Sequence, residues 1–114
     1  MSRVFVVCEP TRGYGSNCVK AMNLTPAAKW GEIIVVVPDA QSFISPAKTM
    51  LGVHDVLKDF CDDDYVLPVG DPILMCSVAA VAMKNNSGKV RFLKWDRRNQ
   101  DYLVVAVNLN KPGE

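Results

Sequence analysis

The sequence contains one tight turn that could hold a small ligand. Asp71 follows Gly70 and precedes Pro72, directly before an apolar run from Ile73 to Met83. An aspartate followed by a proline is typical of a helix start, and the free amides of a first helical turn attract anions. Gly70 and Asp71 are therefore candidate ligand-binding residues of a small nucleotide-binding protein.

The same turn has a simpler structural interpretation. The Asp71 carboxylate would itself accept hydrogen bonds from the amides that a phosphate needs, and its charge would repel the phosphate. A cation such as magnesium, bound by Asp71 together with one of Asp62, Asp63 and Asp64, would avoid this conflict. No spaced ligand motif demands a metal. A capped strand-to-helix turn is thus the favoured interpretation, and we expect no cofactor.

A second glycine-containing segment, Thr11 to Asn17, follows an apolar run near the start of the chain. Its Gly13 and Gly15 resemble part of the phosphate-binding turn of dinucleotide-binding proteins. The third glycine of that turn and the acid that binds ribose are both missing. A surface loop is therefore favoured, with Arg12 and Tyr14 as exposed contact residues for a partner.

Five basic residues within ten positions form a second candidate surface. They are Lys89, Arg91, Lys94, Arg97 and Arg98. Two aromatic residues, Trp95 and Tyr102, interleave with them, and this combination can hold phosphates and stack bases. Charged hairpins also prevent sheets from pairing edge to edge. We expect a solvated hairpin first, a protein partner with acidic groups second and nucleic acid third, with Lys94, Arg97 and Arg98 as contact residues.

The residues that most often act as nucleophile and base show no catalytic spacing. The four cysteines, Cys8, Cys18, Cys61 and Cys76, form no Cys-x-x-Cys pair, and the single histidine, His54, has no cysteine near it in sequence. We interpret the cysteines as reduced thiols of a cytoplasmic protein. The sequence therefore favours a protein that is not an enzyme, although an active site can be assembled from distant residues.

Alternating strand-like and helix-like segments must position these residues, which predicts an α/β fold. Strands are predicted at Arg3–Cys8, Glu32–Val37, Tyr65–Val69, Lys89–Trp95 and Tyr102–Leu109, and helices at Thr25–Gly31, Ser45–Phe60 and Ile73–Met83. The first two strands are apolar without alternation, which indicates interior positions in a parallel or mixed sheet. The last two are joined by a short polar connector, which predicts a C-terminal antiparallel β-hairpin.

Three of these elements carry specific expectations about burial. The helix from Ser45 is amphipathic and should lay one apolar stripe on the sheet. The Ile73–Met83 helix is apolar on nearly every side, so we expect it to be enclosed on most sides. In the last strand, the alternating residues from Leu103 to Leu109 form an apolar face that we expect to cover the core.

Composition indicates one globular α/β domain that spans residues 1–114. The chain has 49% hydrophobic and 22% charged residues, and its net charge of +1 gives no general attraction to nucleic acid or anionic membranes. The charge is nevertheless separated. Six acids and one lysine give −5 over residues 55–71, and seven bases and two acids give +5 over residues 84–111. A symmetric dimer in which the acidic stretch meets the basic hairpin is one hypothesis.

Three stretches resemble small proteins of tailed bacteriophages to which no activity is assigned. These are residues 24–28 (LTPAA), 63–72 (DDYVLPVGDP) and 90–97 (VRFLKWDR). The resemblance extends over most of the chain and includes no catalytic motif. It implies a viral gene product that works in the host cytoplasm.

From these observations we predict a non-enzymatic interaction module that binds a host or viral protein in the host cytoplasm, without membrane association, and that is a candidate homodimer. The alternative is a small nucleotide- or metal-binding α/β protein that uses the strand-turn-helix at Gly70, Asp71 and Pro72 with the loop around Gly13 and Gly15. Weak binding of nucleic acid by the basic hairpin is the third interpretation.

Overall fold

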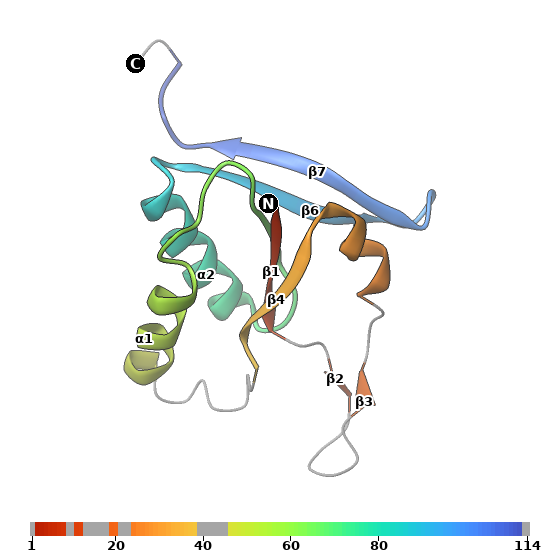
Figure 1. The fold of residues 1–114 in the computed structure, drawn as a ribbon, viewed down its shortest axis with the longest axis horizontal. Helices are drawn as coiled ribbons and strands as arrows, with labels where there is room; N and C mark the ends of the chain where they lie inside the picture. Colours follow the sequence, from red (N-terminus) through yellow and green to blue (C-terminus); the bar gives the residue numbers. More distant parts are fainter. Residues whose placement is uncertain (1, 9–10, 13–18, 21–23, 39–45, 113–114) are drawn as a thin grey trace.

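The computed structural model describes residues 2–8, 11–12, 19–20, 24–38 and 46–112. The fold is organised around a five-stranded mixed sheet (Figure 1). The strand order is β4-β1-β5-β6-β7. The strands are β1 (Arg3–Cys8), β4 (Glu32–Val37), β5 (Tyr65–Leu67), β6 (Lys89–Asp96) and β7 (Asp101–Asn108). The first four in this order are parallel, and β7 is antiparallel to β6. The predicted α/β fold with a C-terminal hairpin is confirmed.

Helices cover the two faces of the sheet unequally. Helices α1 (Pro46–Val56) and α2 (Pro72–Asn85) pack on one face, and the short 3₁₀ helix η2 (Thr25–Trp30) packs on the other (Figure 1). A two-stranded ribbon of β2 (Thr11–Arg12) and β3 (Val19–Lys20) lies outside the main sheet. No helix among the described residues is long and apolar enough to span a membrane.

Strand β1 is the centre of the core because its side chains are covered on both faces. Phe5 and Val7 pack with residues of α1 and α2, whereas Val4 and Val6 pack with residues of η2. All four side chains are fully buried. Burial on both faces explains why this segment is apolar without alternation.

A buried ion pair attaches the segment before β5 to the start of β1. The Asp64 side chain is 1% exposed, and its carboxylate accepts hydrogen bonds from Arg3 Nε at 3.1 Å and Arg3 Nη2 at 2.8 Å. The backbone amides of Arg3 and Cys61 also donate to this carboxylate. A buried carboxylate with this many donors is fully compensated, so Asp64 acts as a structural group.

Several predicted details are wrong. Strand β4 was predicted to be an interior strand but lies at an edge of the sheet. The prediction failed because the apolar pattern reflects the cover of its two faces by α1 and η2, and it carries no information about neighbours in the hydrogen-bonding direction. Helix α1 ends at Val56 rather than Phe60, where the chain turns toward β5, and Ser45 lies outside the described residues. Thr25 followed by Pro26 predicts Thr25 as the cap of this helix, but Leu24 occupies the N-cap position of η2, without a side-chain hydrogen bond.

The predicted burial of the α2 helix and the last strand is also wrong. Only Leu74, Val78, Val81 and Ala82 of α2 are buried, and Ile73 is 68% exposed, because no third layer covers the outer side of this helix. Strand β7 is an edge strand, and Leu103 and Val105 on the face predicted to cover the core are 41% and 38% exposed. Both expectations assumed more covering layers than the described residues supply.

Candidate functional site

The predicted turn at Gly70 is a place of close packing between the ends of β1 and β5. The Cys8 thiol donates a hydrogen bond to the Val69 carbonyl at 3.3 Å, and burial raises the pKa of this thiol. Gly70 has φ +106°, and a Cβ atom at this position would lie 2.1 Å from Cys8 Sγ. The glycine is thus explained by backbone conformation and by the neighbouring sulfur.

Asp71 caps helix α2, as the sequence indicates. Its Oδ1 accepts hydrogen bonds from the amides of Ile73 at 2.9 Å and Leu74 at 3.2 Å. The acids Asp62–Asp64 come before β5, whereas Asp71 comes after it, so they lie at opposite ends of that strand. A cation held jointly by Asp71 and these acids is therefore excluded by the fold. No cluster of three metal-ligating residues occurs in the described part of the chain.

The second glycine-containing loop follows β1 and lies mostly outside the described residues. Gly13, Tyr14 and Gly15 lie outside the described residues, and Arg12 belongs to the short strand β2. Because β1 and β5 are parallel neighbours, the chain leaves β1 at the same sheet edge as Gly70.

The hairpin tip presents Arg97 and Arg98 to solvent at the far end of β6 and β7 (Figure 1). An ion pair between Lys29 of η2 and Asp101 fixes the base of this tip, and the hydrogen bond from Lys29 lowers the pKa of Asp101. Lys94 is also exposed, on the opposite side of β6 from Trp95. The tip is therefore positioned, solvated and basic.

The aromatic residues of the hairpin do not form a platform beside these basic groups. Trp95 and Tyr102 are cross-strand partners whose rings meet edge to face, with centroids 5.0 Å apart. Tyr102 is buried, and Trp95 packs against the core cluster on the η2 side of the sheet. Base stacking requires accessible ring faces, so the packing of this pair gives the nucleic-acid interpretation no support.

Strand β7 has an open apolar edge that the sequence analysis missed. Leu103, Val104 and Val105 are 37–41% exposed, and Leu109 is 65% exposed. We call these four residues the β7 edge surface. Among the described residues β7 pairs only with β6, and no charged residue occurs from position 102 to 110. The alternating pattern indicated a strand, but only the sheet order reveals that its neighbour on one side is missing.

An apolar groove continues from this edge along α2. It has a volume of about 590 Å³ and is lined mainly by small or apolar side chains. These lining residues are Cys76, Ala79, Ala80, Met83, Lys84, Gly88 and Leu109. Leu109 therefore belongs both to the groove and to the β7 edge surface, so the two form one exposed apolar region.

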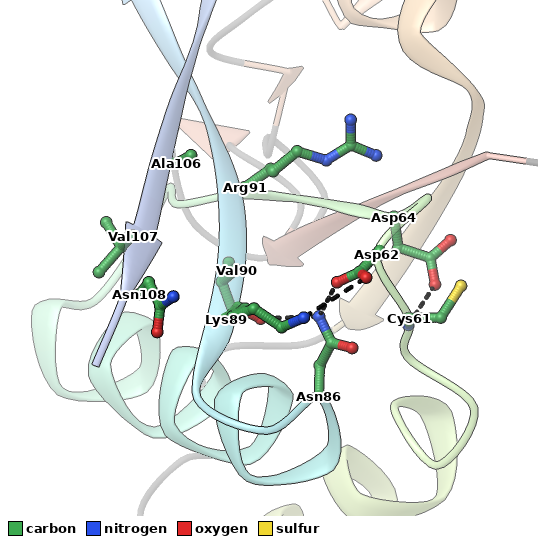
Figure 2. A pocket seen from close by; sticks show the side chains of 10 residues that line it. All are labelled: Cys61, Asp62, Asp64, Asn86, Lys89, Val90, Arg91, Ala106, Val107 and Asn108. Carbon is green, nitrogen blue, oxygen red and sulfur yellow. Dashed lines mark hydrogen bonds and ion pairs between the residues drawn. The ribbon is translucent and has the colours of Figure 1, made fainter. Parts of the chain in front are cut away.

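A separate polar pocket of about 410 Å³ lies at the amino ends of β5 and β6 (Figure 2). Asp62 sits 3.5 Å from Lys89 and accepts a hydrogen bond from Asn86 at 2.9 Å. Both interactions, the Asn86 hydrogen bond first, lower the pKa of Asp62. The sequence placed these residues in two opposite charge runs, and the parallel register of β5 and β6 brings them together.

No curated protein and no solved structure matches this chain. A family model described as "Phage Pam3 gp32-like protein" matches residues 2–109, which is nearly the whole chain. The resemblance to small bacteriophage proteins is therefore confirmed, and the chain belongs to this phage family.

Proposed function

We propose that this phage-family protein is a non-enzymatic interaction module that binds a host or viral protein in the host cytoplasm through the β7 edge surface. The observation that carries the proposal is an edge strand without charged residues from Tyr102 to Asn108 and with exposed aliphatic side chains on both faces. Natural proteins usually protect such an edge with charges, prolines, bulges or a covering segment. Between Leu103 and Val107, strand β7 has no charge, proline or bulge, and no segment of the described part of the chain pairs with its outer edge.

The backbone of β7 supports docking by strand addition. Leu109 N donates to Gly88 O at 2.9 Å, which continues the β6–β7 ladder beyond the last paired residues. Backbone groups alternate in direction along an antiparallel strand, so the amides of Val104 and Ala106 are directed away from β6, toward the open edge. An extended segment of a partner can pair with them and place its side chains against the β7 edge surface.

The basic tip adds an electrostatic component to this surface. Arg97 and Arg98 are exposed directly before β7 begins. Exposed charges at the rim of an interface mainly accelerate association with partners of opposite charge. We therefore expect an extended partner segment that combines apolar residues with acidic ones.

The alternative nucleotide- or metal-binding function at Gly70 and Asp71 receives less support from the geometry. The Asp71 carboxylate already accepts from two amides, and Gly70 is in close contact with Cys8. Both residues thus have structural roles that require no ligand.

Affinity capture with two matched variants tests the proposal. Val104→Lys places a charge in the open edge, whereas Leu51→Lys places the same charge on α1, at an aliphatic residue that is 73% exposed. Tagged proteins would be incubated with nuclease-treated lysate of infected host cells, and captured proteins identified by mass spectrometry. We expect the wild type and Leu51→Lys to enrich the same protein, and Val104→Lys to lose at least about tenfold of it.

Three results would count against the proposal: equal capture by Val104→Lys, capture that disappears with nuclease, and no capture. Light scattering of each variant provides a parallel reading of self-association. A dimer that Val104→Lys dissociates would identify the partner as a second copy of this chain.

A further inference from the structure

Arg91 is a cation whose hydrogen-bonding groups are unused. Its guanidinium carbon lies 4.2 Å from the centre of the Tyr65 ring, and its Nε is buried without a hydrogen-bond partner. No other described residue accepts a hydrogen bond from this side chain. Ring stacking fixes the plane of a guanidinium but satisfies none of its N–H groups. The Nε atom is closed to solvent, so an acceptor in the pocket would reach this guanidinium through its terminal nitrogens.

The acids around Arg91 are committed to other partners. Asp64 is paired with Arg3 at 2.8 Å, and Asp62 is paired with Lys89 at 3.5 Å. Among the described residues that line the pocket, Arg91 is thus the charged side chain without an ion-pair partner of its own. The pocket has one unneutralised positive charge.

The shape and lining of the pocket limit the ligand further. Its volume of about 410 Å³ suits a small organic molecule, and Ala106, the cross-strand partner of Arg91, provides an apolar contact on the same face of the sheet. Figure 2 shows Ala106 and Arg91 on the neighbouring strands β7 and β6, and Lys89 beside Asp62. A phosphate monoester would bring a second negative charge close to the ionised Asp62, and that charge would be repelled. A planar carboxylate matches both the single charge and the fork geometry of a guanidinium.

We propose that this pocket binds a small organic monocarboxylate, with the carboxylate on Arg91 and the apolar body against Ala106, which lies beside Arg91 on the same face of the sheet. This site lies at the amino ends of the parallel strands, and its existence does not depend on the protein partner proposed for β7. Arg91 would then bind a ligand, whereas the sequence analysis expected it to be one of several solvated cations of the hairpin.

Benzoate is a suitable probe, and benzamide is its neutral control of nearly the same shape. Amide NMR spectra of the ¹⁵N-labelled protein would be recorded with increasing concentrations of each compound. We expect benzoate to shift the amide signals of Arg91 and Ala106 in a saturable manner. Benzamide and inorganic phosphate should bind at least about tenfold more weakly.

Two arginine variants complete the test. Arg91→Gln should reduce benzoate affinity at least about tenfold, whereas Arg97→Gln removes a tip charge and should leave it unchanged. Arg91→Lys keeps the charge without the fork, so a loss of affinity in this variant supports bidentate binding even if Arg91→Gln fails to fold. Equal binding of benzamide, unchanged affinity in Arg91→Lys, or shifts confined to other residues would overturn the proposal, as would the absence of saturable shifts.

Discussion

At the scale of single residues, Asp64 shows how burial changes the meaning of a charge. The sequence contains three consecutive aspartates, which suggested a cation site. Asp64 instead supports the fold through Arg3 and the Cys61 amide, while Asp62 faces the pocket and Asp63 is exposed. The sequence alone cannot distinguish the three aspartates, because their roles depend on contacts with distant strands. Asp64 contacts Arg3 of β1, and Asp62 contacts Lys89 of β6.

Replacement of Asp64 by Asn should make stability less dependent on pH. Burial raises the pKa of Asp64, but hydrogen bonds from Arg3 and the Cys61 amide outweigh this effect and hold the pKa below its ordinary value. The stabilisation from Asp64 is therefore present above the unfolded-state pKa of about 3.9 and is lost as pH falls through the lower folded-state value. At neutral pH we expect Asp64→Asn to cost about 1.5–3 kcal/mol.

Urea unfolding at about pH 7 and about pH 3 would test this expectation. The stability difference between wild type and Asp64→Asn should shrink at the lower pH. A difference that stays the same at both pH values would contradict the structural role of the ionised carboxylate. Asp63→Asn is the matched control, since Asp63 is an exposed neighbour in the same acidic run.

Asp71 is the residue at which sequence reasoning worked best. Its capping role was predicted because a cap depends only on the few residues that follow it, and the structure confirms both acceptor contacts. The pairing of Arg3 with Asp64 spans 61 positions, and no local pattern encodes it. The pocket around Arg91 was missed for the same reason.

At the scale of secondary-structure elements, apolar patterns predicted where strands occur but not which strands have neighbours. Strand β4 has a continuous apolar pattern and lies at one edge, and β7 has alternating apolar residues and lies at the other. Side-chain patterns report the cover on the two faces of a sheet. Whether a strand lies at an edge depends on the order of the strands in the sheet, which is set by the connections between parallel strands and is not encoded in the pattern of any one strand.

Two proline variants test the direction of the backbone groups in β7. The amide of Ala106 is directed to the open edge, whereas that of Val105 is directed to β6. We expect Ala106→Pro to be tolerated, because proline is compatible with the outer side of an edge strand. Val105→Pro should cost at least about 1 kcal/mol more, because it removes a ladder hydrogen bond.

Urea unfolding of the two proline variants measures this difference directly. Equal destabilisation would show that the assigned alternation of hydrogen bonds is wrong. Ala106→Pro should also weaken partner capture, since it removes one of the donors that strand addition uses.

At the scale of the whole molecule, the charge separation seen in the sequence is partly cancelled by the fold. Lys89 belongs to the basic run, yet it pairs with Asp62 of the acidic run. Arg97 and Arg98 lie at the other end of the hairpin, in the turn before β7, and form no ion pair with the residues that the structure describes. The exposed positive charge is therefore concentrated next to the apolar β7 edge surface, which is the arrangement expected of an interface with a steering rim.

Hydrogen exchange of the backbone amides, measured on the free protein and on its complex with the captured partner, tests the central claim most directly. Strand addition at β7 should slow the exchange of the Val104 and Ala106 amides at least about tenfold, because both gain hydrogen-bond acceptors in the complex. The amide of Val105, already directed to β6, should change less. Unchanged exchange at Val104 and Ala106, with new protection confined to other parts of the chain, would contradict the account.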